Sequence, residues 1–386
     1  MTTSIRRHPF GNTPDGESVD LFTLRGSGGV EASIMTYGAA LQALLAPDRG
    51  GHRGTVGLGF ATLDGYVENS GHFFGATVGR YANRIAEARF ALDGIVHEVD
   101  RNDGQNCLHG GARGFDTRVW DVVEAADGML RLTYSSPDGE MGFPGNLDVR
   151  VEYRLEGTEL RIDYEAATSA PTVVNLTNHT CWNLAGEGSG SVEGRALTLR
   201  ASMFTPVDAN LVPTGEIRPV AGTLLDFRNP TPLGARGCGF DHNVVVDRRD
   251  DSLVLAARVL EPASGRILEV LTTEPGLQLY TGTALDGLLV GTSGRPYRRG
   301  DCIAFETQHF PDSPNHPAFP STVPPPGRDV QVDDGLPLRV TAVVPSRLIA
   351  TPSGWGRADG IGRNAPRSPT RAQSDRACRR CRRRGR

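Results

Sequence analysis

Strict alternation of apolar and polar residues in the middle of the chain constrains its fold more than any other feature. In LDVRVEYRLEGTELRIDYEA, apolar residues occupy every second position over 147–155 and again over 160–164. A period of two places successive side chains on opposite faces of a strand, and the interruption Glu156-Gly157-Thr158 is typical of a tight turn. The segment is therefore predicted to be a β-hairpin with one buried face and one face in water.

Similar short runs recur along the chain. They lie at 19–24, 30–46, 130–135, 195–200, 253–260, 266–272 and 277–282. The 48 glycines and 26 prolines are spread over the whole length, which favours many turns between short strands. No segment carries a sustained apolar stripe of period 3.6, so a doubly wound fold is not indicated. The sequence predicts an all-β chain built as a large sandwich of antiparallel sheets, with residues 1–327 as one domain.

Composition and charge narrow the functions open to the chain. With 386 residues, of which 38% are hydrophobic, it can bury a substantial core. All 41 basic residues are arginine, and residues 328–386 hold 14 of them against five aspartates, so the preceding part is acidic. An acidic body does not favour nucleic-acid binding. Because no apolar stretch could span a membrane and no export signal is present, we expect a cytoplasmic protein with reduced cysteines and no membrane partner.

A carboxylate inside an apolar run is the first candidate for chemistry. In DCIAFETQHF, a strand would direct Ile303 and Phe305 to one side and Ala304, Glu306 and Gln308 to the other. Burial would raise the pKa of Glu306 toward the range useful to a general base. A structural ion pair with an arginine is the alternative that the residue pattern leaves open.

A polar face on PTVVNLTNHTCWNLAG is the second candidate. In an extended conformation, Asn175, Thr177 and His179 share one face. An amide, a hydroxyl and an imidazole in a row are typical of a polar-ligand cleft, and Trp182 would be a nearby stacking wall. A hydrogen-bonded core network is the alternative.

Two further clusters place polar groups beside apolar residues. Asn83 and Arg84 lie in GRYANRI, although Arg84 alone is more typical of a surface arginine. His109 precedes Gly110-Gly111 in NCLHGG, and such glycines permit unusual dihedrals and close approach to a ligand. The histidines show no metal-ligand spacing and the Gly-x-Ser-x-Gly elbow is absent, so neither a metal site nor a serine hydrolase is predicted.

Over roughly residues 15–327 the chain resembles the aldose 1-epimerase (galactose mutarotase) family. The matching motifs occur in the family's order: GRYANRI, NCLHGG with GFDTRVW, SPDGEMGFPGNL, NLTNHTCWNL, VDANLVPTGEI with LDFR, FDHNVVVD, GLQLYTG and ETQHFPDSPNHPAFPS. The resemblance implies a galactose-mutarotase-like β-supersandwich that interconverts the α and β anomers of free aldohexoses such as galactose or glucose. It implies a sugar as the small-molecule partner and no cofactor. The sequence does not decide between a monomer and a homodimer.

The resemblance also implies roles for individual residues. Glu306 matches the family's catalytic base, His179 its catalytic acid, and His109 a second histidine near the sugar ring oxygen. The matched substrate-binding positions are Asn83, Arg84, Asp241 and Gln278. A base that takes the C1 hydroxyl proton and an acid that protonates the ring oxygen open the ring, and reclosure on the other face completes the exchange.

Two other functions remain open at this point. A non-catalytic carbohydrate-binding protein of the same fold would need Arg84 and Asp241, but not both Glu306 and His179. A hexose-6-phosphate mutarotase would need an additional cationic pocket for the phosphate, and no motif indicates one.

The character of the chain changes after Gly327. The family ends in a strand rich in threonine that finishes Tyr-Arg-Phe, whereas this chain continues RDVQVDDGLPLRV. Codons compatible with GRDVQVDDGLPLRV, read one base later, encode Gly-Glu-Thr-Tyr-Arg-Ser-Thr-Thr-Val-Tyr-Arg-Phe-Ala. We therefore interpret residues 328–386 as an out-of-frame translation that is disordered. The alternative is a basic tail that binds nucleic acid or acidic surfaces.

Nucleotide sequencing around codons 326–327 tests this interpretation. We expect one additional base there, and a frame that ends in Tyr-Arg-Phe followed closely by a stop once that base is removed. If the neighbouring frame does not encode this ending, the frameshift hypothesis is wrong.

Overall fold

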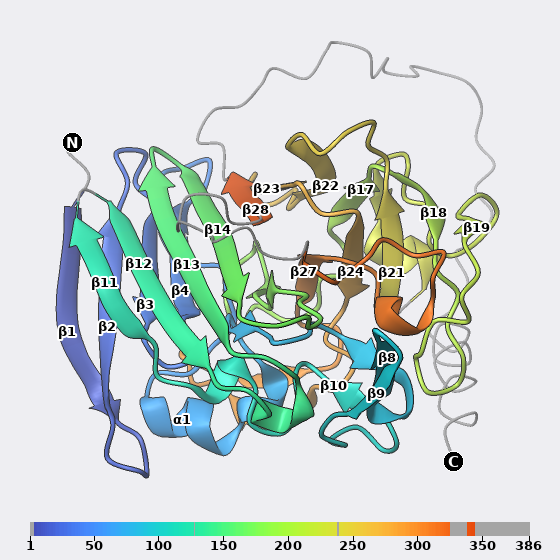
Figure 1. Cartoon of the computed structure of the whole chain (residues 1–386). Coiled ribbons are helices and arrows are strands. Elements are labelled where there is room, and N and C mark those ends of the chain that lie inside the picture. The colour runs from blue at the N-terminus through green and yellow to red at the C-terminus, as the bar shows by residue number, and fades with distance from the viewer. Residues whose placement is uncertain (1–3, 127, 238, 325–337, 344–386) are drawn as a thin grey trace, which may run out of the picture. The chain divides into compact units, whose positions relative to one another are not determined.

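The computed structural model describes residues 4–126, 128–237, 239–324 and the strand at 338–343. The chain divides into two units, 1–348 and 349–386, and every described residue belongs to the first. Strands dominate this unit (Figure 1), and they pair antiparallel within each of its larger sheets. The prediction of an all-β chain with antiparallel sheets is confirmed. Among the described helices, none is long and apolar enough to cross a membrane.

Three larger sheets contain most of the strands. The five-stranded sheet is β1 (Ser4–Asn12), β2 (Ser18–Arg25), β3 (Glu31–Met35), β4 (Ala40–Pro47) and β5 (Arg53–Thr55). The nine-stranded sheet runs β11 (Asp121–Ala126), β12 (Met129–Ser136), β13 (Leu147–Glu156), β14 (Glu159–Thr168), β28 (Leu338–Val343), β23 (Ile267–Thr272), β22 (Val254–Leu260), β17 (Ala196–Leu199) and β20 (Thr231–Pro232). The six-stranded sheet runs β16 (Cys181–Trp182), β27 (Ile303–Gln308), β24 (Gly276–Tyr280), β21 (Asp241–Val246), β18 (Ala201–Phe204) and β19 (Arg218–Pro219).

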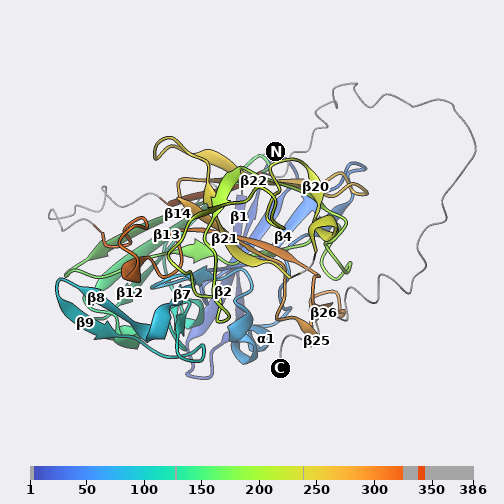
Figure 2. The same cartoon turned by 90° about the vertical axis from the view of Figure 1, so that its right-hand side faces the viewer.

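Short elements complete the described part of the chain. The two-stranded pairs are β10 (Cys107–Leu108) with β7 (Arg84–Ile85), β15 (Thr177–Asn178) with β6 (Thr77–Val78), β25 (Asp286–Val290) with β26 (Pro296–Arg298), and β8 (Arg89–Leu92) with β9 (Ile95–Glu98). The helix α1 (Leu63–Glu68) is joined by the 3-10 turns η1 (Ser70–His72), η2 (Ala86–Ala88), η3 (Phe115–Thr117), η4 (Glu140–Gly142), η5 (Leu233–Arg236) and η6 (Ser313–Asn315). Figure 2 shows β7, β8 and β9 toward the same lower edge as α1, β25 and β26.

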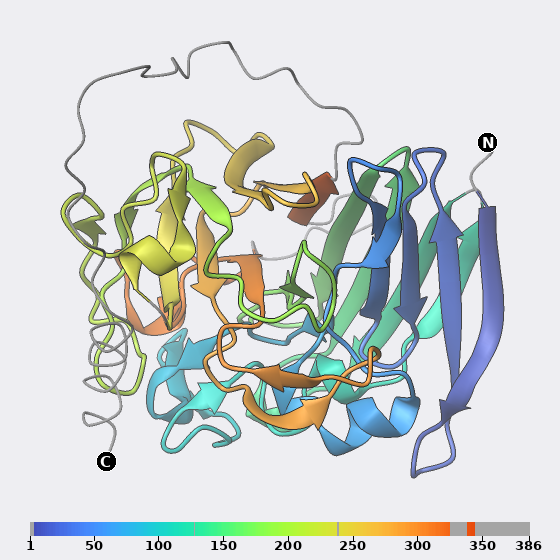
Figure 3. The same ribbon diagram turned by 180° about the vertical axis from the view of Figure 1, so that it is seen from behind.

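The predicted hairpin forms the middle of the nine-stranded sheet. In β13 the apolar positions from Leu147 to Leu155 are buried, while the alternate positions are half-buried or exposed. The five-stranded sheet lies against β11–β14 (Figures 1 and 3), and the two layers share one apolar core. One hydrogen bond ties the layers directly, because the Tyr153 hydroxyl donates to the Ala39 carbonyl at 2.7 Å. Burial of these apolar faces is the main favourable term in such a sandwich.

The six-stranded sheet packs its inner side chains into the same core as β17, β22 and β23. Its strand β27 is buried along its whole length between β16 and β24. Ile303 and Phe305 belong to the large core, whereas Ala304 belongs to a second apolar cluster on the other side. The predicted alternation of faces is therefore confirmed, and Glu306 is held on a strand that is paired on both edges.

The strand β28 differs from the expectation for the tail. Leu338–Val343 pairs antiparallel with β14 on one side and β23 on the other, so it joins the two halves of the nine-stranded sheet. Disorder is therefore wrong for these six residues. Backbone hydrogen bonds can be formed by almost any sequence, and the apolar Leu338, Val340 and Ala342 recur with the period of a strand. The remainder of 328–386 lies outside the described residues, and the frameshift stays a prediction about the gene.

Removal of residues 328–386 should destabilise the protein and promote its aggregation. The deletion leaves β14 and β23 with unpaired backbone groups on facing edges, and exposed edges pair with other chains. We expect a lower midpoint of thermal unfolding and larger species in size-exclusion chromatography. Removal of only residues 349–386 is the matched control, because it keeps β28. Equal behaviour of the two truncated proteins would contradict this role of β28.

Candidate active site

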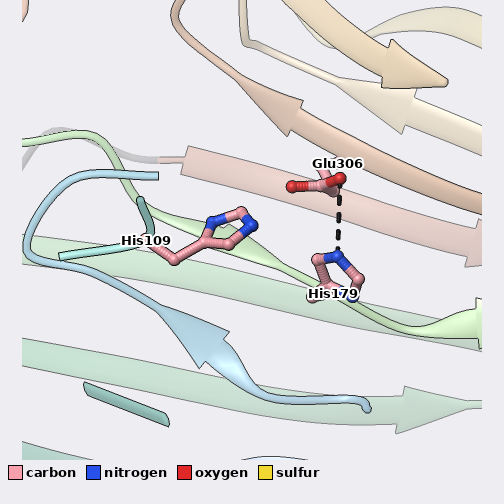
Figure 4. Close-up of side chains that lie close together, drawn as sticks. All are labelled: His109, His179 and Glu306. Atoms are coloured by element: carbon pink, nitrogen blue, oxygen red, sulfur yellow. Dashed lines mark ion pairs between the residues drawn. The ribbon is translucent and has the colours of Figure 1, made fainter. Parts of the chain in front are cut away.

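Three buried side chains from distant parts of the sequence point toward one another (Figure 4). Glu306 comes from β27, His179 follows β15, and His109 follows β10. Their exposed fractions are 2%, 6% and 5%. The Nε2 atom of His179 lies 3.6 Å from Oε1 of Glu306, and one ligand atom of each residue lies within 4.8 Å of the others. The structure thus brings together the three residues for which the sequence predicts catalytic roles.

Burial and mutual attraction shift the proton affinities of this group. Burial raises the pKa of the Glu306 carboxyl to about 7, and the nearby His179 limits that rise. Burial by itself lowers the pKa of His179, but the charge of Glu306 and the contact with Cys181 outweigh it and raise the pKa to about 9. Between these two values the pair consists of a carboxylate and an imidazolium. A base and an acid are then present at the same time.

The backbone of Asn83 fixes the tautomer of His109. The Asn83 N–H donates to Nδ1 of His109 at 3.1 Å, so in the neutral ring the proton lies on Nε2. Burial, together with the charges of His179 and Arg84, lowers the pKa of His109 well below its usual value. Neutral His109 can therefore donate a hydrogen bond from Nε2.

This tautomer also bears on metal binding. His109, His179 and Glu306 have the residue types of a metal site, and their ligand atoms are close enough to share an ion. In neutral His109, however, one ring nitrogen accepts a hydrogen bond and the other carries the proton. Neither nitrogen offers a free lone pair, so this arrangement fits proton transfer better than metal coordination.

Backbone conformation aims several residues at the site. Asn83 and His109 have φ values of 64° and 53°, which are uncommon for residues other than glycine. The next residue, Gly110, has no room for a side chain, because a Cβ atom there would lie 2.1 Å from the carbonyl oxygen of Gly79. The glycine was expected to permit close approach to a ligand, but here it permits close approach of two backbone segments.

Only part of the polar face predicted around His179 reaches the site. Of Asn175, Thr177 and His179, only His179 lines the cavity. The side-chain amide of Asn175 donates to the backbone carbonyls of Ala82 and His309. Trp182 packs in the large core and does not line the cavity, so the predicted stacking wall is wrong. The regular strand that would have kept one face is short, since β15 contains only Thr177–Asn178.

A cavity of about 250 Å³ surrounds the three residues, near the lower end of the range for small-ligand sites. Its lining combines charged, amide and aromatic groups with apolar ones. The lining residues are Gly71, His72, Phe73, Phe74, Asn83, Arg84, Leu108, His109, His179, Cys181, Leu211, Asp241, Tyr280, Thr283, Ala284, Leu285 and Glu306. Such a mixture suits a small molecule that has both hydroxyl groups and apolar ring faces.

The other predicted site residues lie in or directly behind this lining. Arg84 reaches the cavity with its Nε atom donating to Asp103 at 2.7 Å, which leaves the Nη groups as its donors for a ligand. Asp241 also lines the cavity. Gln278 does not; its amide donates to Oδ1 of Asp241 at 2.6 Å. Gln278 therefore supports Asp241 from behind.

Sequence reasoning missed the aromatic residues of the lining. The Phe73 ring centroid lies 4.6 Å from that of His109 and 5.8 Å from that of His179, and Phe73 has a φ of 53°. The ring centroid of Tyr280 lies 5.9 Å from that of His179. Tyr280 could have been predicted from the sequence, because it lies in the motif GLQLYTG, two positions after Gln278. Phe73 carries no comparable signal, because its place in HFFG resembles any core segment.

The chain is similar to known proteins over most of its length. A family model described as aldose 1-epimerase matches residues 20–334. Galactose mutarotase of Sus scrofa is 44% identical over 332 residues, which cover 84% of this chain and 96% of the relative. Aldose 1-epimerase of Escherichia coli K12 is 37% identical over 317 residues, which cover 80% of this chain and 91% of the relative.

Solved structures show the same fold. An aldose epimerase homologue from C. elegans superimposes with a TM-score of 0.77 at 30% identity and covers 83% of this chain and 97% of its own. Galactose 1-epimerase from Lactobacillus acidophilus gives 0.73 at 25% identity, covering 89% and 99%. The fold and these similarities together mean that the chain belongs to the aldose 1-epimerase family.

Proposed function

We propose that Glu306 and His179 catalyse the aldose 1-epimerase reaction in this chain, with free galactose or glucose as substrate. The observation that carries the proposal is the buried pair itself, with Nε2 of His179 at 3.6 Å from Oε1 of Glu306. A reaction that removes one proton and donates another needs both groups in opposite protonation states. The family relatives named galactose mutarotase and aldose 1-epimerase support this substrate class.

The steps follow from the protonation states. The Glu306 carboxylate takes the proton of the C1 hydroxyl, and the His179 imidazolium donates a proton to the ring oxygen. The bond from C1 to the ring oxygen breaks, and the aldehyde turns about the C1–C2 bond. The ring then closes on the opposite face, with the roles of Glu306 and His179 reversed. Atoms and charges balance without any co-reactant, which agrees with the expectation that no cofactor is needed.

The remaining polar groups orient the sugar. His109 donates from Nε2 and would stabilise the negative charge that develops on the ring oxygen as its bond to C1 breaks. The Nη groups of Arg84 and the carboxylate of Asp241 would bind hydroxyl groups, and Gln278 would hold Asp241. Asn83 acts mainly through His109, since its backbone N–H and carbonyl both bond to that residue.

The two alternative functions find less support. A protein that only binds sugar gains nothing from a buried carboxylate beside an imidazole, because burying such a pair is costly. For a hexose 6-phosphate, the described lining offers a single arginine, Arg84, and that arginine is paired with Asp103. Asp241 and Glu306 in the same lining would repel a phosphate dianion.

Location and assembly remain sequence-based expectations. We propose that the enzyme acts in the cytoplasm as a monomer or homodimer. The cysteines Cys107, Cys181 and Cys302 are free thiols, which is consistent with a reducing compartment.

The substitution Glu306→Gln should abolish most of the activity and keep the fold. Glutamine has nearly the same shape but cannot take a proton, so kcat should fall by about 10²- to 10⁴-fold. Polarimetry on freshly dissolved α-D-galactose and α-D-glucose measures this. Glu274→Gln is the matched control, since Glu274 is also buried but pairs with His309 outside the cavity. Wild-type turnover in Glu306→Gln would rule out Glu306 as the base.

The rate should depend on pH as a bell-shaped curve. As pH rises through about 7, Glu306 loses its proton and becomes an active base, so kcat/KM increases. As pH rises further through about 9, His179 loses the proton that it must donate, so kcat/KM decreases. The measurement is kcat/KM from pH 5 to 10 after subtraction of the spontaneous rate. A profile that keeps rising above the upper value would argue against His179 as the acid.

A further inference from the structure

A buried aspartate outside the cavity contacts the segment that carries Arg84. Asp312 follows Glu306 by six positions, and the residue is 2% exposed. Its backbone N–H donates to the carbonyl of Arg84 at 2.8 Å. Its carboxylate oxygen Oδ1 accepts from the backbone N–H of Ala86 at 2.9 Å. Asp312 therefore forms hydrogen bonds with the backbone on both sides of Ile85.

The turn after β27 is organised around this aspartate. Asp312 has a φ of 58° and precedes η6. The side chain of Asn315 donates to the same Oδ1 at 2.6 Å, and Nε2 of His316 lies 3.2 Å from Oδ2. The backbone N–H of Ser313 donates to the hydroxyl of Tyr81, which also comes from the Arg84 segment. A backbone strain of this kind persists only where the surrounding structure enforces it.

A second tie joins the same two segments. The side-chain oxygen of Asn175 accepts from the backbone N–H of His309, and its amide donates to the carbonyl of Ala82. The segment that carries the base, from Glu306 onward, is thus fixed to the segment 80–86 at two places.

The segment 80–86, which Asp312 contacts, forms one edge of the active site. In β7, Arg84 pairs with Leu108 of β10, and His109 is the next residue. Asp312 binds the carbonyl of Arg84 in β7 and the N–H of Ala86, the residue directly after β7. Its contacts therefore bear on the position of Arg84 directly and on that of His109 through one strand pair.

We propose that Asp312 is a positioning residue of the enzyme, which holds the backbone of Arg84 at a fixed distance from the strand of Glu306. This inference rests on the proposed function, because Arg84 is assigned to substrate binding there. The segment PDSPNH, residues 311–316, would then contribute to the site indirectly, since none of its residues lines the cavity.

Substitutions at Asp312 separate its carboxylate from its backbone conformation. Asp312→Gly keeps the positive φ and removes the acceptor. Asp312→Asn keeps both, because asparagine tolerates this conformation and its oxygen can accept from Ala86. For galactose we expect kcat/KM to fall about 10- to 100-fold in Asp312→Gly, mostly through KM. Asp312→Asn should stay within about threefold of wild type.

Ala86→Pro tests the same contact from the other partner. Proline lacks the N–H that donates to Asp312, and Ile85 already has the extended φ of −117° and ψ of 119° favoured before proline. This variant should reproduce the rise in KM even if Asp312→Gly does not fold. Asp48→Gly is the matched control, because Asp48 accepts from the backbone N–H groups of Gly50 and His52 in an exposed turn.

A double-mutant cycle shows whether Asp312 acts through Arg84. In an Arg84→Ala background, Asp312→Gly should add less than a threefold loss. In the single variant Asp312→Gly, both limbs of the pH profile should keep their positions, since Glu306, His179 and the charge of Arg84 are all retained. Circular dichroism and thermal unfolding confirm that each variant is folded.

Two results would overturn the inference. One is an unchanged KM in folded Asp312→Gly and Ala86→Pro, and the other is a full multiplicative loss in the Arg84→Ala background. The proposed function fails separately, if the folded wild-type protein does not accelerate the mutarotation of galactose or glucose.

Discussion

The buried pair of Glu306 and His179 is the interaction on which the rest of the site depends. A carboxylate and an imidazolium, each removed almost completely from water, are costly to bury, and their mutual attraction offsets only part of that cost. The sheets supply the rest, since Glu306 pairs with Gln278 of β24 and lies on a strand that is buried along its whole length. The surrounding structure keeps the Glu306 carboxylate away from water, which would otherwise stabilise its charge. This burial raises its pKa to about 7.

The edges of the cavity are built by a different principle. Arg84 lies in the very short strand β7 and His109 directly follows the equally short β10, and such strands would not stay in place by themselves. Left-handed backbone conformations at Asn83 and His109 direct the chain into the site, and hydrogen bonds between their backbones and the His109 ring fix that geometry. The site therefore combines one rigid strand with a set of turns that depend on specific hydrogen bonds. Such turns make a sugar site adjustable without any change to the core.

Several features could be predicted from the sequence because they depend on local patterns. The alternation in β13 and β14 identified the central hairpin, and the alternation around Glu306 identified the two faces of β27. The same reasoning failed around His179, because two residues of regular strand do not keep Asn175 and Trp182 on the faces that an extended chain would give them. Phe73 could not be predicted either, since its contact with His109 depends on a turn conformation that the residues HFFG do not indicate. In the tail, Leu338–Val343 was not expected to be a strand, because residues 328–386 were interpreted as an out-of-frame translation, yet these residues pair with β14 and β23.

The sequence alone determined the fold class, the family and the residue types that an acid and a base require, since periodicity and ordered motifs are properties of the chain itself. The tertiary structure decided which atoms meet. It set the distance between Glu306 and His179, the tautomer of His109, and the place of Gln278 behind Asp241. These depend on contacts between segments more than 25 residues apart, and no local pattern encodes them. The physical reason is that proton transfer is decided by distance and burial, and both arise only when the sheets pack.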